Sequence, residues 1–165
     1  MTIDNYTLDT IFNIINIIPL PTWLLMIFAP NWNITHKIVK SHITSVIISI
    51  IFVILNIIFF ANDTDKFNIT GFFSLNMITY VFTKKFIVLI GWVHYLAFDL
   101  LIGSWIFLDN FNNENQVSHI LMIICFILTY VFGPSGFLFY VIIKKIKKIK
   151  YDLSIKTEIN KTKSN

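Results

Sequence analysis

Long apolar segments without charge constrain the fold of this chain more than any other feature. The chain has no Arg, and a segment over residues 86–108 is interrupted only by Asp99. Segments free of Lys, Asp and Glu run over residues 20–35, 41–62 and 116–143. A helix of about 20 apolar residues crosses the hydrocarbon core of a bilayer. We therefore predict an all-α integral membrane protein, built as a four-helix bundle. The predicted spans are residues 8–30, 41–61, 86–108 and 118–143.

The remaining segments fit one membrane domain over residues 1–143 followed by a tail. Hydrophobic residues make up 56% of the sequence and the mean hydropathy is +0.72, both well above values for soluble proteins. The segment 71–83 is apolar but too short to span, so we predict a short helix lying at the membrane interface between the second and third spans. Residues 144–165 are rich in Lys, and we expect a disordered cytoplasmic tail whose charge would attract anionic headgroups.

The distribution of lysines predicts an orientation. An even number of spans would put both termini and the loop 61–85 on one side, together with all the lysines except Lys37 and Lys40. By the positive-inside rule we expect both termini in the cytoplasm. The leader carries Asp4 and Asp9 and lacks the basic or Arg-rich character of a targeting peptide, so the first span is expected to stay in the mature protein. With the AT-rich codon bias that the composition indicates, these features predict a bacterial inner membrane.

Two ionisable residues, His94 and Asp99, lie inside the third span. A carboxylate at the bilayer centre costs on the order of 2.5–3.5 kcal/mol on insertion scales, and intramembrane acids are functional by default. Helical geometry puts Asp99 near Trp92 and Tyr95, whereas His94 lies about 140° round the helix and about 7.5 Å along its axis. The two residues therefore either face different neighbours or border one cavity. Alternatively, both residues have a purely structural role, in which each forms a hydrogen bond to a neighbouring helix.

Helix-breaking and polar residues also mark the first and fourth spans. Prolines weaken the first half of the first span, where a kink is expected. In the fourth span Pro134 frees a backbone carbonyl, and Gly133 and Gly136 allow close approach of a partner backbone or ligand. Side chains expected to face the bundle interior are the candidate ligand-binding groups. They are Asn13, Asn16, Trp92, Tyr95, Tyr130 and Ser135.

A metal or haem site is not expected. The other three histidines lie near the far ends of their predicted elements, about 21 Å from the depth of His94, so a bis-histidine haem is disfavoured. The membrane contains no second carboxylate, and Cys125 is the single cysteine. We expect no cofactor, no metal and no nucleic-acid partner, and membrane lipids as the surroundings of the protein.

Three strings in the sequence resemble one known family: "PTWLLMIFAPNWNITHKIVKS", "GWVHYLAFDLLIGSWIFLD" and "GPSGFLFY". They are similar to the membrane proteins of the abscisic-acid-deficient-four type, over about residues 21–140. Plant members of this family are four-span proteins of plastid envelopes that are required to make neoxanthin from violaxanthin, and many bacterial relatives have an undefined role. The residues that match the family's motifs are Pro30, Thr35, Trp92, His94, Asp99, Gly133, Pro134 and Gly136.

The resemblance implies a protein that binds, and in one interpretation isomerises, a carotenoid or other isoprenoid lipid. The plant pathway opens an epoxide to form an allene, which needs a proton donor for the epoxide oxygen and a base, in a dry pocket. On chemical grounds we assign His94 as the base and Asp99 as the acid or its orienter. The alternative is a non-enzymatic membrane partner or scaffold subunit. One apolar cavity facing both residues would favour catalysis, and a packed bundle with a hydrogen-bonded Asp99 would favour the subunit.

Overall fold

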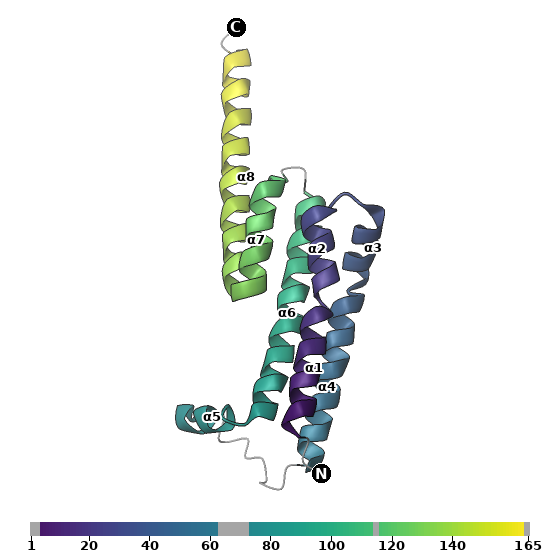
Figure 1. Cartoon of the computed structure of the whole chain (residues 1–165). Helices are drawn as coiled ribbons and strands as arrows, with labels where there is room; N and C mark the ends of the chain where they lie inside the picture. Colours follow the sequence, from purple (N-terminus) through teal and green to yellow (C-terminus); the bar gives the residue numbers. More distant parts are fainter. Residues whose placement is uncertain (1–3, 63–72, 114–115, 164–165) are drawn as a thin grey trace.

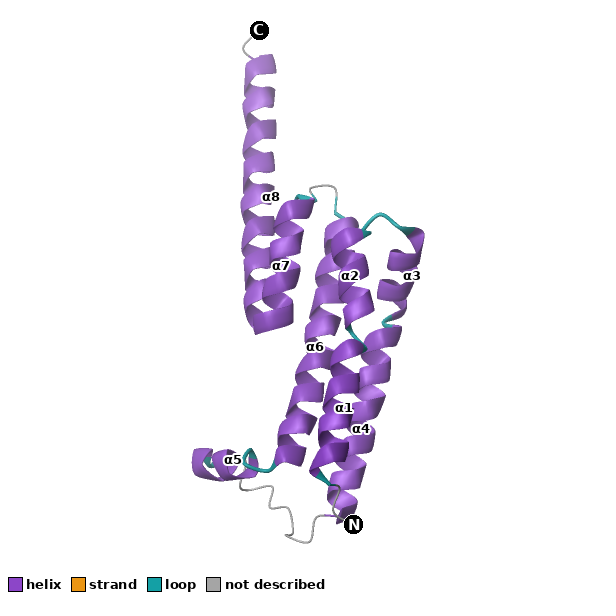
Figure 2. Cartoon of the chain, viewed as in Figure 1, coloured by secondary structure: helices purple, strands orange, loops and turns teal. Residues whose placement is uncertain are grey.

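The protein is all-helical over the residues that the structure, a computed structural model, describes: 4–62, 73–113 and 116–163. Most helices run along one common axis, and one short helix lies across it (Figure 1). Within the described residues no strand occurs, and short loops join the helices (Figure 2). The predicted all-α class is confirmed.

The first membrane passage is a kinked helix. α1 (Asn5–Ile17) begins after Asp4, whose side chain accepts a hydrogen bond from the backbone N–H of Thr7 and so caps the helix. α2 (Leu20–Phe28) follows directly after Pro19, which has no N–H with which to continue the α1 ladder. Together the two helices form an apolar passage of 24 residues, Asn5–Phe28. The predicted kink is therefore present.

The second passage begins earlier in the chain than predicted. α3 (Asn33–Ser41) starts almost at once after α2, because the fully buried Thr35 donates its hydroxyl to the carbonyl of Ala29 at 2.7 Å and closes the turn. α4 (Ile43–Asn62) continues in the same direction after a break at His42, whose φ of 50° is left-handed. Residues 31–40, which the predicted spans left between the first and second helices, are thus mostly helix, and the passage runs over Asn33–Ala61.

α6 (Lys85–Phe111) is the central helix, and it packs against α1, α3, α4, α7 and α8. Val93, Leu100 and Ile106 on this helix are fully buried. α5 (Leu75–Val81) precedes it, has no buried residue and lies across the end of the bundle (Figure 1). This orientation is what a helix on a membrane surface would adopt, but its placement at the interface stays a prediction. Residues 71–72 of the predicted interfacial segment lie outside the described part.

The predicted fourth span is instead a helical hairpin. α7 (His119–Phe132) runs back along α6, and α8 (Pro134–Lys163) returns beside α7 towards the end from which α7 came (Figure 1). The chain reverses at Gly133, whose φ of 41° and ψ of −90° are not helical and therefore end α7. Pro134 then starts the next helix. α7 is only about 21 Å long, shorter than the bilayer core of about 30 Å. The prediction of one broken span over 118–143 is corrected by this turn.

The hairpin changes the topology of the chain. Among the described residues three helical passages are long and apolar enough to cross a membrane, α1–α2, α3–α4 and α6. The N-terminus and the C-terminus therefore lie at opposite ends of the molecule (Figure 1). The expectation that both termini share one side of the membrane stays a prediction, and it requires that the fourth segment cross the membrane.

The Lys-rich segment after residue 143 is helical rather than disordered. α8 continues without a break to Lys163 and extends beyond the end of the bundle (Figure 1). No Gly or Pro follows Gly136 in this helix, and Lys and Ile are compatible with helix. The prediction of disorder rested on the high charge of this segment. Charge disfavours a packed core, but it does not disfavour a helix.

Candidate functional site

A cavity of about 460 Å³ opens between α6 and the tip of the α7–α8 hairpin. Its polar groups are few, and its walls are mostly aromatic and aliphatic. The tip of the hairpin ends beside the middle of α6, so the cavity lies in the middle of the predicted membrane span. The residues that line it are Trp92, Tyr95, Leu96, Asp99, Tyr130, Val131, Phe132, Gly133 and Pro134.

Asp99 is the acidic group of this cavity. The side chain is half-buried, and no described side chain or backbone group forms a hydrogen bond with its carboxyl group. Gly133 lies against it: a Cβ at residue 133 would stand 2.5 Å from Asp99 Oδ1, and the φ of Gly133 is positive. Glycine is therefore required here both for the turn and for the close approach to the carboxyl group. The hydrogen-bonding capacity of Asp99 remains available to a ligand.

Trp92 forms the boundary between this cavity and a smaller one. Its indole N–H donates to Asn16 Oδ1 at 2.9 Å, and its ring lies 5.8 Å from that of Phe12, centroid to centroid. Trp92 also lines the second cavity, of about 220 Å³, which ends near the ion pair of Asp9 and Lys85 at 2.7 Å. The predicted ligand-binding residue Asn16 thus holds Trp92 in place and does not itself line either cavity.

His94 faces away from Asp99. Its side chain is exposed on the flank of α6 beside α4, with ring centroids 5.5 Å from Phe52 and 4.6 Å from Phe98. It does not line the Asp99 cavity. Of the two arrangements left open by the sequence, the structure therefore has the one in which the residues face different neighbours. The two are not close enough together to act as an acid–base pair on one ligand.

Of the other predicted ligand-binding residues, some line the Asp99 cavity and others do not. Tyr130 lines the cavity, and its ring packs edge-on against Trp23 at 5.7 Å. Asn13 is exposed on α1, away from the cavity. Ser135 is also exposed, and its hydroxyl reaches only the carbonyl of Leu128, at 3.5 Å. Tyr95, Tyr130 and Trp92 thus join Asp99, whereas Asn13 and Ser135 do not.

The residues predicted to be structural motifs mostly build close packing. Gly136 lets α7 and α8 cross, since a Cβ there would overlap Thr129 and the backbone of Cys125. Gly103 lies about one turn after Asp99 on α6, and a Cβ there would overlap the Trp23 indole. Pro30 lies in the turn that Thr35 closes, and it borders a separate cavity of about 310 Å³ between α2, α6 and α7.

A polar cluster that the sequence did not reveal ties the hairpin to α6. Asp109 Oδ2 accepts hydrogen bonds at 2.5 Å from the hydroxyl of Tyr140 and from Nζ of Lys144. Tyr140 is fully buried, and Asn110 holds the start of the hairpin through both the N–H and the carbonyl of Val117. The sequence does show that Tyr140 and Lys144 are four residues apart and so share one helix face. It does not show their partner, because Asp109 is more than 30 residues away.

These features define a class: a helical protein with several apolar helices long enough to cross a membrane, in which a helical hairpin covers an aspartate near the middle of α6. The family profile described as ABA DEFICIENT 4-like matches residues 10–140. The chain belongs to this family, which confirms the resemblance drawn from the sequence. It is 25% identical over 135 residues to "Protein ABA DEFICIENT 4, chloroplastic" of Arabidopsis thaliana, covering 80% of this chain and 59% of that relative. The chain therefore spans less than two thirds of that relative's length, and no solved structure matches it.

Proposed function

We propose that this protein binds an apolar isoprenoid lipid, such as a carotenoid, in the cavity beside Asp99. The observation that carries the proposal is an aspartate that has no hydrogen-bond partner among the described residues and lies in a cavity walled largely by aromatic side chains. Its volume of about 460 Å³ lies within the range of about 300–1,000 Å³ usual for small-molecule sites. Asp99 would bind a polar end group, while Trp92, Tyr95 and Tyr130 contact the apolar part.

The cavity supports ligand binding over the alternative of a scaffold subunit. The subunit interpretation predicts a packed bundle in which Asp99 is hydrogen-bonded across a helix interface. The carboxyl group instead borders a void, and Gly133 keeps the hairpin backbone close to it. A membrane-protein partner stays the alternative, and it requires that this void be filled by a partner side chain.

The same site would support isomerisation of an epoxide. Opening an epoxide to an allene moves a proton from carbon to oxygen, with no net gain or loss of protons. A protonated carboxyl group can donate its O–H to the epoxide oxygen while its second oxygen accepts the proton from carbon. In this proposal Asp99 performs both transfers, and His94 has no part, because it lies outside the cavity. The name of the plant relative, ABA DEFICIENT 4, is compatible with such a pathway.

Lipid and pigment analysis tests the proposal. The full chain is solubilised gently from cells that make carotenoids, and co-purifying lipids are identified by mass spectrometry. We expect wild type and His94→Gln to retain the same isoprenoid lipid, and Asp99→Leu to lose it. The two substitutions are matched, since each removes one intramembrane ionisable group from α6. Retention of ordinary phospholipid alone by wild type would contradict the proposal and favour the scaffold subunit.

The structure also leads us to infer a revised orientation. The end that carries α3 and the emerging part of α8 holds ten of the described lysines, whereas Lys84 and Lys85 lie near the opposite end. By the positive-inside rule, the C-terminus would face the cytoplasm or the equivalent organellar compartment, and the N-terminus would lie on the other side. The bacterial inner membrane stays a prediction, since the plant relative is chloroplastic.

A further inference from the structure

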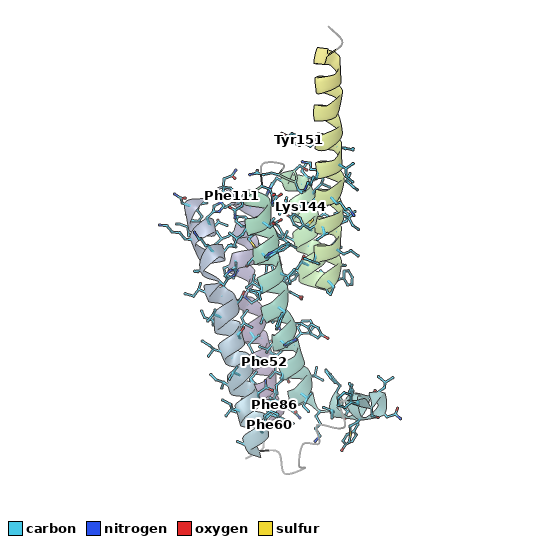
Figure 3. All side chains as sticks on the ribbon, turned by 180° about the vertical axis from the view of Figure 1, so that it is seen from behind. Phe52, Phe60, Phe86, Phe111, Lys144 and Tyr151 are labelled. Atoms are coloured by element: carbon cyan, nitrogen blue, oxygen red, sulfur yellow. The ribbon has the colours of Figure 1, made fainter. Side chains whose placement is uncertain are left out.

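One flank of α8 changes from apolar to basic at the point where the helix leaves the bundle. Residues 144–150 contain five lysines and no acidic residue. Lys144 is bound to Asp109, and Lys147 donates to the backbone carbonyl of Gln116 at 2.5 Å. Figure 3 shows Lys144 near the same end of the molecule as Phe111, the last residue of α6. The ion pair with Asp109 therefore marks the depth at which the membrane-spanning helix ends.

Lys145 and Lys148 differ from these two bound lysines. Both are exposed, and no described acidic side chain pairs with either of them. They stand one turn apart on the same helix flank, because residues three positions apart are neighbours on a helix surface. Below them the same flank exposes aliphatic side chains, Val141 at 39% and Ile142 at 47%. This flank therefore passes from a surface suited to acyl chains to a surface suited to anions within about two turns.

We propose that Lys145 and Lys148 bind the phosphate-bearing headgroups of anionic membrane lipids. Long Lys side chains reach from an apolar helix surface to the headgroup level while their stems stay in contact with acyl chains. A basic segment immediately outside a membrane helix is attracted to the negative surface of an anionic leaflet. The occupant is a lipid rather than a soluble anion, because the aliphatic side chains directly below the two lysines contact the acyl chains of the same molecule. This site is separate from the Asp99 cavity and does not depend on the function proposed for it.

Native mass spectrometry of the full chain in nanodiscs tests this site. The nanodiscs contain equal amounts of phosphatidylcholine and phosphatidylglycerol, and the lipids that stay bound on ejection are counted. We expect wild type to be enriched in phosphatidylglycerol, and the double variant Lys145→Gln/Lys148→Gln to lose that enrichment by on the order of tenfold. The matched control is Lys37→Gln/Lys40→Gln, an equal loss of charge at the same end on α3, which should keep most of the enrichment.

Three outcomes would overturn the proposal. They are an absence of enrichment in wild type, unchanged enrichment in Lys145→Gln/Lys148→Gln, and an equal loss in the control, which would indicate a response to net charge alone. Both lysines are exposed, and neither is paired with a described acidic side chain, so helix content by circular dichroism should be the same in all variants. In wild type, 0.5 M NaCl should reduce the enrichment, because salt screens exposed charges at this depth.

Discussion

Asp99 on α6 and Gly133 at the tip of the α7–α8 hairpin lie in direct contact, close enough that a Cβ at residue 133 would stand 2.5 Å from Asp99 Oδ1. This contact joins two unusual features of the chain, an acidic residue in the middle of a long apolar helix and the tip of a helical hairpin. The turn positions the wall of the cavity, and the acid supplies its polar group. A change at either residue should therefore affect the other.

Gly133→Ala should destabilise the hairpin. An L-residue at positive φ costs about 1–2 kcal/mol, and the added methyl group would also overlap Asp99. We expect a lower thermal midpoint in detergent than for Gly91→Ala, whose added Cβ would approach only the movable Phe82 ring, at 3.3 Å. In the double variant Gly133→Ala/Asp99→Ala the overlap is removed, so the thermal midpoint should rise by the part of the decrease that the overlap caused. Equal midpoints for Gly133→Ala and Gly91→Ala would contradict the contact.

The ion pair between Asp109 and Lys144 should contribute more to stability than the one between Asp9 and Lys85. The Asp109 carboxylate is 23% exposed and also accepts the Tyr140 hydroxyl, whereas the Asp9 carboxylate is 59% exposed. Asp109→Asn should lower the free energy of unfolding by about 1.5–3 kcal/mol, as for hydrogen bonds to charged groups. Asp9→Asn should lower it by about 0.2–1 kcal/mol, as for exposed pairs. Thermal or denaturant unfolding in detergent measures both, and the reverse order would refute this role of Asp109.

The termini should lie on opposite sides of the membrane. Single cysteines are placed at Asn5, Asn33 and Ser154 in a Cys125→Ser background, and labelled in sealed vesicles with a membrane-impermeant maleimide. With three spans and a returning hairpin, Asn33→Cys and Ser154→Cys should react from the same side, and Asn5→Cys from the other. If Asn5→Cys and Ser154→Cys reacted from one side, the fourth segment would cross and the hairpin would be wrong.

The sequence predicted the helical class and a break among the prolines of the first span, because both follow from local composition. Helix geometry put His94 and Asp99 about 140° apart on their helix but left open whether the two border one cavity. The sequence did not predict the reversal at Gly133. A Gly-Pro step ends a helix equally well as a kink or as a turn, and the choice depends on contacts of α8 with α7 and α6. The hydrogen bond from Tyr140 on α8 to Asp109 on α6 is one such contact, and it joins residues 31 positions apart in the sequence. Long-range pairing of this sort leaves no periodic pattern in one sequence.

Site residues were predictable where they share a helix face with Asp99. Trp92 and Tyr95 follow from the spacing on α6, and both line the cavity. Asn16 was expected to face the bundle interior as a ligand-binding group, and it instead accepts a hydrogen bond from Trp92, a pairing between helices that one sequence does not specify. Ser135 was expected to face inward because its segment was taken as part of one crossing helix. In the hairpin it lies just beyond the turn and is exposed.

Photo-crosslinking from the cavity tests the central claim most directly. The photoreactive residue p-benzoylphenylalanine replaces Tyr95, which lines the Asp99 cavity, and in a matched variant it replaces Phe98, which lies about one turn further along α6, is 53% exposed and does not line the cavity. After irradiation in membranes that contain carotenoids, mass spectrometry identifies the attached molecules. We predict an isoprenoid adduct at position 95 and bulk phospholipid at position 98. Identical phospholipid adducts at both positions would contradict a ligand site beside Asp99.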